Sequence, residues 1–254
     1  MTLELNKIYC GDCLDLMREM PDKSVDLVLT DPPYGTTQNK WDDKINLELI
    51  WPEFKRVGKE DCVYVFTASQ PFTTDLINSN RQWFKYEWIW NKSGGGNFLN
   101  ANRTPLKIHE NILVFSQNAA RYTPQKQIGK PRFKGGKKYA NNGCYGDYNE
   151  VAAVKYNEYF PKSIIEISNT SQGEKEHSTQ KPLALMEYLI QTYSSVCDTV
   201  LDPFMGSGTT CVACKKLGRN FIGIEKEPAY VAIAEKRLEK VNNHKLTDFF
   251  NGGE

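Results

Sequence analysis

The sequence predicts a doubly wound α/β fold with a mostly parallel, seven-stranded sheet and one irregular insertion. Three features support this prediction. Short apolar runs alternate with helical patterns, two of the runs end in Asp-Pro, and the periodicity is lost from residue 117 to about residue 171. The chain has 254 residues, of which 40% are apolar, so it can bury the core that such a sheet needs.

The first half of the chain alternates strands with helices and finishes with two strands. Strands are predicted at residues 7–10, 24–30, 62–67, 83–90 and 110–116. Helices are predicted from the pattern of Leu14, Leu16, Met17 and Met20, and at 47–57 and 71–79. Residues 93–96, Ser-Gly-Gly-Gly, predict a flexible turn between the last two strands, which can then pair antiparallel.

The last third of the chain returns to the same alternation. Helices are predicted at residues 182–194, 207–217 and 227–241, and strands at 199–202 and 221–225. The sequence shows no internal repeat. These elements complete one α/β domain that is interrupted by the insertion.

The tetrapeptide Asp31-Pro32-Pro33-Tyr34 ends the apolar strand at 24–30. Proline lacks the N–H that a central strand needs, so the two prolines stop the strand and fix the backbone just beyond its carboxyl end. Ligands bind at the carboxyl ends of strands in open α/β sheets. The tetrapeptide therefore places a carboxylate and an aromatic ring where a ligand is expected.

A second strand end carries the stretch Asp202-Pro203-Phe204-Met205-Gly206-Ser207-Gly208. Its glycines allow a ligand to approach the backbone, and Glu225 ends the next strand, where such folds keep an acid for ribose hydroxyls. A phosphate loop of the G-x-x-x-x-G-K-[ST] type is absent, and Cys211 replaces the third glycine of a dinucleotide site. An acid before the glycines would repel a pyrophosphate but can hold an amine. The expected cofactor is therefore a nucleoside that carries an amino acid, which is S-adenosylmethionine.

The insertion contains a basic block on a chain whose formal net charge is only +1. Every charged residue between 117 and 138 is a cation, namely Arg121, Lys126, Lys130, Arg132, Lys134, Lys137 and Lys138. Aromatic residues are interleaved with them or follow closely, namely Tyr122, Phe133, Tyr139, Tyr145 and Tyr148. This mixture is typical of segments that contact phosphates and stack on bases, and the alternative is a solvated loop.

Other features exclude several classes of protein. No apolar run has the roughly 18 residues of a membrane span, and the N-terminus lacks a signal-peptide pattern, so we expect a cytoplasmic protein. The seven cysteines include two C-x-x-C pairs, Cys10/Cys13 and Cys211/Cys214. An odd number of cysteines favours reduced thiols, and the second pair falls in a predicted helix, so we expect core cysteines rather than a zinc site.

These motifs together resemble the β-class DNA amino-methyltransferases, the S-adenosylmethionine-dependent N6-adenine and N4-cytosine DNA methylases. The resemblance rests on the Asp31 and Asp202 motifs in this order with a basic segment between them. It also rests on Gly11-Asp12 and on His177-Ser178-Thr179-Gln180-Lys181-Pro182. It implies a Rossmann-like methyltransferase fold with circularly permuted motif order. Residues 1–116 would be the catalytic half, 117–171 a target-recognition insertion and 172–254 the cofactor-binding half.

The resemblance also implies roles for individual residues in cofactor binding. Asp202 and the turn of Gly206 and Gly208 would hold the methionine end, and Phe204 belongs to the same motif. Glu225 would bind the ribose and Asp12 the adenine. Thr179 or Lys181 would lie at the carboxylate region of the cofactor. No metal is expected.

The chemistry of an exocyclic amine suggests how the tetrapeptide acts. The lone pair of such an amine is delocalised into the ring. Catalysis therefore needs acceptors for its N–H groups and an orientation in which the nitrogen faces the methyl group of the cofactor. The Asp31 carboxylate and the Pro32 carbonyl can each accept one N–H, Pro33 stiffens the turn, and Tyr34 can stack on a base flipped out of the duplex.

In the resembled family, an Asp rather than a Ser at the first position favours adenine N6. Transfer to cytosine N4 or to an RNA base remains an alternative, as does a DNA-binding module that has lost catalysis. The expected partner is double-stranded DNA, a homodimer is possible, and any restriction endonuclease would be a separate chain.

Overall fold

The computed structural model describes residues 3–35, 45–96, 98–134, 154–169 and 180–241. The chain forms two compact units. One consists of residues 1–123 and 163–254, and the other is Pro124–Lys162. The larger unit contains an α/β sheet and every residue of the candidate site described below.

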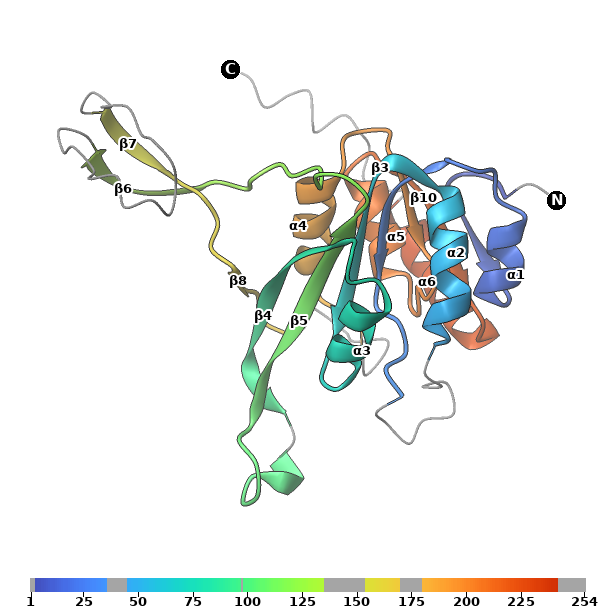
Figure 1. The fold of residues 1–254 in the computed structure, drawn as a ribbon, viewed down its shortest axis with the longest axis horizontal. Helices are drawn as coiled ribbons and strands as arrows, with labels where there is room; N and C mark the ends of the chain where they lie inside the picture. The colour runs from blue at the N-terminus through green and yellow to red at the C-terminus, as the bar shows by residue number, and fades with distance from the viewer. Residues whose placement is uncertain (1–2, 36–44, 97, 135–153, 170–179, 242–254) are drawn as a thin grey trace. The chain divides into compact units, whose positions relative to one another are not determined.

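The sheet of the larger unit has eight strands within the described residues, in the order β1-β10-β9-β2-β3-β5-β4-β8. Figure 1 labels β10, β3, β5, β4 and β8 of this sheet. In that order the strands are Lys7–Cys10, Asn220–Glu225, Thr199–Asp202, Val25–Thr30, Gly58–Ala68, Lys107–Ser116, Phe84–Gly96 and Ile164–Glu166. Neighbours from β1 to β3 pair parallel, whereas β5 pairs antiparallel with both β3 and β4. The predicted mostly parallel α/β sheet is confirmed.

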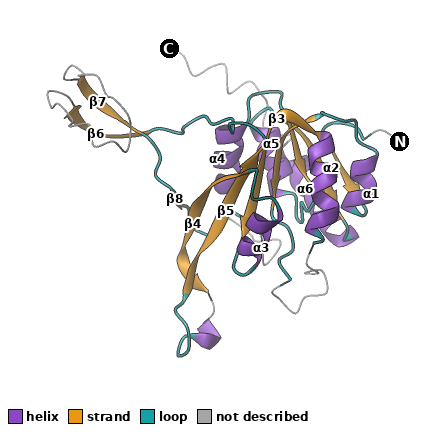
Figure 2. Ribbon diagram, viewed as in Figure 1, coloured by secondary structure: helices purple, strands orange, loops and turns teal. Residues whose placement is uncertain are grey.

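Helices cover both faces of the sheet, as the alternating pattern predicts (Figure 2). Along β2, Leu27 and Leu29 point into one apolar cluster and Val28 into the other, because successive side chains of a strand face opposite sides. The first cluster includes residues of α4 (Leu183–Tyr193), α5 (Thr209–Lys216) and α6 (Pro228–Val241). The second includes residues of α1 (Cys13–Arg18), α2 (Leu47–Val57) and α3 (Phe72–Ser79).

None of the helices in the described part of the chain combines the length and the apolar character needed to cross a bilayer. The longest of them, α6, has 14 residues.

Two parts of the larger unit differ from the sequence prediction. The expected turn at residues 93–96 is part of β4, because Gly96 pairs with Lys107 across the hairpin, and the chain turns after it, near the short 3₁₀ helix Phe98–Asn100. The eighth strand, β8, was not predicted. It has three residues and only Ile165 is buried, so it gives no periodic pattern.

The smaller unit is more regular than predicted. Strands β6 (Gln127–Lys134) and β7 (Val154–Tyr159) form an antiparallel pair, with a register shift between Ile128 and Arg132. The loss of alternation at this shift and the proline in β6, Pro131, explain why the sequence pattern did not indicate a strand. Residues 135–153 lie outside the described residues.

Candidate active site

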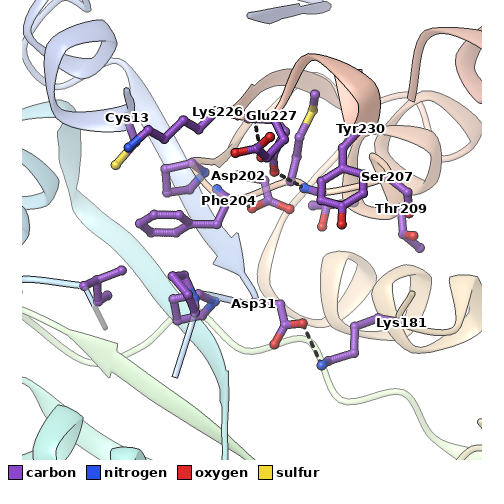
Figure 3. A pocket seen from close by; sticks show the side chains of 18 of the residues that line it. Cys13, Asp31, Lys181, Asp202, Phe204, Ser207, Thr209, Lys226, Glu227 and Tyr230 are labelled. Atoms are coloured by element: carbon purple, nitrogen blue, oxygen red, sulfur yellow. Dashed lines mark hydrogen bonds and ion pairs between the residues drawn. The ribbon is translucent and has the colours of Figure 1, made fainter. Parts of the chain in front are cut away.

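A cavity of about 610 Å³ opens at the carboxyl edge of the parallel strands. Asp31 follows β2, Asp202 ends β9 and Glu225 ends β10, and these neighbouring strands run in the same direction, so their carboxylates meet at one edge. Figure 3 shows Asp31 and Lys181 on one side of this cavity and Asp202 with Tyr230 on the other. The fold thus joins two motifs that lie far apart in the sequence.

Most of the predicted catalytic and cofactor residues line this cavity, namely Asp12, Asp31, Pro32, Pro33, Tyr34, Lys181, Asp202, Phe204, Gly206 and Glu225. Gly208 does not line it, and Thr179 lies outside the described residues. The predicted phosphate-binding cations are not among the lining residues either.

Asp31 accepts bonds from three side chains. Its Oδ1 accepts hydrogen bonds from the hydroxyl of Tyr34, at 2.6 Å, and from the hydroxyl of Thr67. Its Oδ2 lies 2.6 Å from the ammonium Nζ of Lys181. Burial and the neighbouring carboxylates raise the pKa of Tyr34 well above its ordinary value, so the phenol keeps its proton and remains a donor to Asp31.

One face of the Tyr34 ring is occupied. The ring stacks on Phe72 of α3, with centroids 5.4 Å apart and planes inclined by 20°. Phe72 is buried, and Tyr34 lines the cavity as well. The tyrosine is thus braced by an aromatic ring of the protein, which fixes its position at the edge of the cavity.

Lys181 lies against Asp31 and a second acid rather than at the glycine turn of the cofactor motif. Its Nζ is 2.6 Å from Asp31 Oδ2 and 3.2 Å from Glu110 Oε2. Only 13% of its side chain is exposed. The ammonium thus lies beside the candidate catalytic acid, in the cavity that the cofactor motif also lines, and its predicted contact with the cofactor carboxylate stays a prediction.

Glu110 was not predicted as a site residue. It lies on β5 next to the apolar residues 112–115, and it lines the cavity because antiparallel β5 passes the carboxyl edge of β3 near its own start. The sequence feature that could have indicated it is an acidic residue shortly before a buried apolar run. Gln180 also lines the cavity, and its buried Oε1 has no hydrogen-bond partner among the described residues.

Asp202 is a buried carboxylate at the end of β9, with 3% of the residue exposed. Its Oδ1 accepts a hydrogen bond from the Thr30 hydroxyl at 2.7 Å and one from the Phe204 backbone N–H at 3.2 Å. Burial raises its pKa from 3.8 to about 6. A cation next to such a carboxylate stabilises its ionised form, and the amine of the cofactor is the cation expected there.

Glu225 is held by the backbone of two turns. Its Oε2 accepts from the N–H of Gly206 and its Oε1 from the N–H of Glu227, both at 2.9 Å. Burial raises its pKa, although these hydrogen bonds favour the ionised form. Each oxygen retains a further lone pair, so the carboxylate can still accept from two neighbouring hydroxyls.

Asp12 caps helix α1 and also lines the cavity. Its Oδ1 accepts from the backbone N–H of Leu14 at 2.9 Å and of Asp15 at 3.4 Å. A capping role accounts for an aspartate at this position. The side chain still lies in the cavity wall, where the resemblance expects an adenine contact.

The two glycines of the turn after β9 have different neighbours. Gly206 has φ +51°, and a Cβ built on it would meet no atom within 4 Å. Gly208 has φ +75° and caps α5, and a Cβ there would come within 2.7 Å of Ala234 Cβ. Gly208 is therefore required for the close contact between α5 and α6, and it shapes the site only indirectly.

Two of the predicted DNA-contacting cations have carboxylate partners within the protein. Arg121 contacts Asp198 and lies 3.0 Å from Asp61, and Lys126 lies 2.9 Å from Glu158 of β7. The exposed cations of β6 include Lys130 and Arg132, whose guanidinium lies 5.6 Å from the ring centroid of Tyr159. Lys137 and Lys138 lie outside the described residues, as does the side chain of Lys134.

The cysteine pair of helix α5 belongs to the core. Cys211 and Cys214 are fully buried, and burial raises the pKa of both thiols far above the ordinary value. A metal needs the thiolate form, which this environment opposes. Within the described residues, no group of three or more His, Cys, Asp and Glu side chains could hold a metal ion.

An α/β sheet with a glycine turn and several acids around one cavity at the carboxyl edge of its strands is typical of Rossmann-like proteins that bind a nucleoside cofactor. Comparisons with known proteins are more specific. The profile of a family described as DNA methylase, of the N6/N4 type, matches residues 25–236. The type II methyltransferase M.HinfI of Haemophilus influenzae is 31% identical, over 93% of this chain and 69% of the relative.

Solved structures show the same fold. The M1.HpyAVI–SAM complex superposes with a TM-score of 0.62 at 27% identity and covers 94% of this chain and 99% of its own. The cytosine-N4-specific PvuII DNA methyltransferase gives 0.64 at 20% identity, with 95% and 92% covered. The protein belongs to the N6/N4 DNA methylase family, the S-adenosylmethionine-dependent DNA amino-methyltransferases.

Proposed function

We propose that the protein transfers a methyl group from S-adenosylmethionine to adenine N6 of a flipped-out base in double-stranded DNA, by direct in-line attack of the amine. The observation that carries this proposal is the position of Asp31. Its carboxylate opens into the same cavity as Asp202 and Glu225, so an amine acceptor lies beside two acids suited to a nucleoside that carries an amino acid.

The residues present fit that cofactor. Asp202 is a buried acid that an ammonium would stabilise, and Glu225 has acceptor capacity for two ribose hydroxyls. Asp12 and Phe204 line the same cavity, and M1.HpyAVI, a structural relative, has been solved as a SAM complex. When bound, the cofactor supplies an electrophilic methyl group on a sulfonium.

Asp31 and Pro32 act on the target amine. The carboxylate of Asp31 and the carbonyl of Pro32 each accept one N–H, which reduces delocalisation of the nitrogen lone pair into the ring. Pro33 fixes the backbone that carries both acceptors. Thr67 and Tyr34 hold Asp31 in place through Oδ1. Most of the rate gain then comes from positioning and electrostatics.

Tyr34 supports the flipped base. Stacking of a base on an aromatic ring contributes roughly 1–3 kcal/mol, which offsets part of the few kcal/mol needed for flipping. Because Phe72 braces the ring from one side, the tyrosine can hold its position as the base arrives. The preference for adenine over cytosine rests on the family resemblance, in which an acid at the first position of the tetrapeptide accompanies adenine.

The insertion is assigned to target recognition. In its described part, β6 presents Lys130 and Arg132 at the surface, together with the exposed side chain of Phe133. Cations of this kind contact phosphates, and aromatic side chains stack on bases.

The decisive experiment is nucleoside mass spectrometry of DNA and RNA incubated with the protein and methyl-labelled cofactor. We expect label in N6-methyladenine of DNA. Label confined to N4-methylcytosine would contradict the adenine assignment, and label confined to RNA would contradict the DNA assignment. A protein that binds DNA and cofactor but incorporates no label would be the DNA-binding module without catalysis.

A further inference from the structure

Four charged side chains form a row of alternating sign, of which Asp31, Lys181 and Glu110 line the cavity and Lys92 is paired with Glu110. Lys92 Nζ lies 3.0 Å from Glu110 Oε1, Lys181 Nζ lies 3.2 Å from Glu110 Oε2, and the same Nζ lies 2.6 Å from Asp31 Oδ2. The two ammoniums balance the two carboxylates. The row therefore carries no net charge. This pairing lowers the cost of burial, since three of the four side chains are at most 15% exposed.

The Lys181 ammonium is surrounded by aromatic rings and carboxylates of the cavity wall. Its Nζ lies 5.9 Å from the ring centroid of Tyr34 and 6.0 Å from that of Trp90, and the two carboxylates cover further directions. A buried cation is strongly destabilised without a hydrogen-bonded acceptor. Wherever Lys181 moves within the cavity, it must therefore keep Asp31 or Glu110 as a partner.

Lys181 is already paired with the oxygen of Asp31 that has room to accept from the target amine. Tyr34 and Thr67 already donate to Oδ1 of Asp31, and Lys181 is bound to Oδ2. An amine that donates to this carboxylate must share Oδ2 with the ammonium or displace it. Displacement is favourable only where a second acceptor takes up the ammonium at the same time.

Glu110 meets this requirement. Lys92 is bound to its Oε1, whereas its buried Oε2 lies near Lys181 Nζ but accepts no hydrogen bond from the described residues, so it can take up the ammonium. Burial opposes ionisation of Glu110, but the ammoniums of Lys181 and Lys92 hold its pKa below the usual range. The two carboxylates raise the pKa of Lys181 against the effect of burial. Both partners therefore stay charged at neutral pH.

We propose that Glu110 is a positioning residue that takes over the Lys181 ammonium from Asp31 when the target amine docks. This inference rests on the proposed function and names a device within the same site. While no base is present, the Lys181 ammonium balances the charge of Asp31 and orients its carboxylate. When the ammonium shifts to Glu110, Oδ2 of Asp31 becomes accessible to the target amine and no buried charge is left unpaired. Glu110 acts through Lys181 and does not touch the reacting atoms.

The test measures the single-turnover rate of methyl transfer at saturating cofactor and DNA. In Glu110→Gln the ammonium has only Asp31 as a charged partner, so it competes with the amine, and we expect the rate to fall roughly 10- to 100-fold. The cofactor Kd should stay within about twofold, since no contact at Asp202 or Glu225 changes.

A second substitution separates this role from a structural one. Lys181→Met removes the competing ammonium, so Glu110→Gln/Lys181→Met should be faster than Glu110→Gln alone. If Glu110 merely stabilised the fold, the double variant would be as slow as the single variant or slower. Should Glu110→Gln fail to fold, Glu110→Asp and Glu110→Asp/Lys181→Met allow the same comparison, because the shorter acid reaches the ammonium less well.

Glu87→Gln is the matched control, because Glu87 is an exposed acid on β4 that accepts from Asn111 away from the cavity. Its rate should equal that of the unmodified protein. An unchanged rate in Glu110→Gln, or a double variant no faster than the single, would overturn the inference while the unmodified protein still methylates DNA. Absence of transfer by the unmodified protein would instead overturn the proposed function and this inference with it.

Discussion

Asp202, which we propose binds the amine of the cofactor, lowers the stability of the folded protein when it is ionised. Its pKa rises on folding from 3.8 to about 6, so the folded protein holds this proton more tightly than the unfolded chain does. The contribution of Asp202 to stability is therefore largest at low pH and is lost as the pH rises from about 4 to about 6. A cation next to the carboxylate would reverse this loss, so the proposed contact with the cofactor amine predicts that cofactor binding is coupled to the ionisation of Asp202.

We expect cofactor affinity to increase as the pH rises through about 6 and then to level off, because the amine requires the ionised carboxylate. Asp202→Asn should weaken binding and remove this pH dependence. Titration calorimetry between pH 5 and pH 8 measures both effects. A variant whose affinity still rises with pH as in the unmodified protein would exclude Asp202 as the group responsible.

The same substitution should stabilise the cofactor-free protein above pH 6, since a neutral amide avoids the burial of a charge and its oxygen can still accept from Thr30 and Phe204. Urea denaturation of the two proteins at pH 7 measures this difference. A lower midpoint for Asp202→Asn would show that the carboxylate stabilises the empty site.

Asp31→Ala should lower the rate of methyl transfer by at least about 10²–10³-fold, because the amine loses a charged acceptor. The cofactor Kd should stay within a few-fold of the original value, since the contacts at Asp202 and Glu225 are untouched. Rates under single turnover and a separate cofactor titration distinguish the two quantities. Unchanged activity would contradict the catalytic assignment.

The junction between β9 and α5 depends on a glycine that does not touch the cavity. Gly208→Ala forces a side chain into a left-handed conformation at φ +75° and against Ala234 of α6. We expect a loss of about 2–4 kcal/mol in the free energy of unfolding, from the backbone conformation and the overpacking together.

Gly206→Ala is the matched comparison for Gly208→Ala. Gly206 also has positive φ but has open space at the Cβ position, so the loss should be about 1 kcal/mol. Denaturant unfolding of both variants measures the difference. Equal losses would mean that the contact with Ala234 relaxes without cost.

The elements of the larger unit were predictable to the extent that they have a regular apolar pattern. The helix Leu47–Val57 and the strand Thr199–Asp202 agree with their predicted bounds, because burial on defined faces imposes that pattern. Strand β8 and the glycine end of β4 were missed because backbone pairing alone defines them. Glu110 was missed for a related reason, since its place in the cavity wall depends on which strand passes the carboxyl edge of the parallel strands.

At the scale of the whole molecule, binding to DNA should depend on salt through the cations of the insertion. Lys130→Gln/Arg132→Gln should reduce the slope of log K against log[salt] by up to about 1.8, at about 0.9 for each lost phosphate contact. Lys236→Gln/Lys240→Gln on α6 removes the same charge elsewhere and should leave the slope unchanged. Equal slopes in all three proteins would mean that β6 does not meet the phosphates.

The order of strands in the sheet has a consequence for biosynthesis. Strands β10 and β9, from the end of the chain, lie between β1 and β2, from its beginning. When the ribosome has released the first hundred residues or so, β1 and β2 each have an open edge whose partner has not yet been made. The nascent chain must keep these edges from aggregating until β9 and β10 emerge. The candidate active site, which spans the same strands, can only be completed once β9 and β10 have been synthesised.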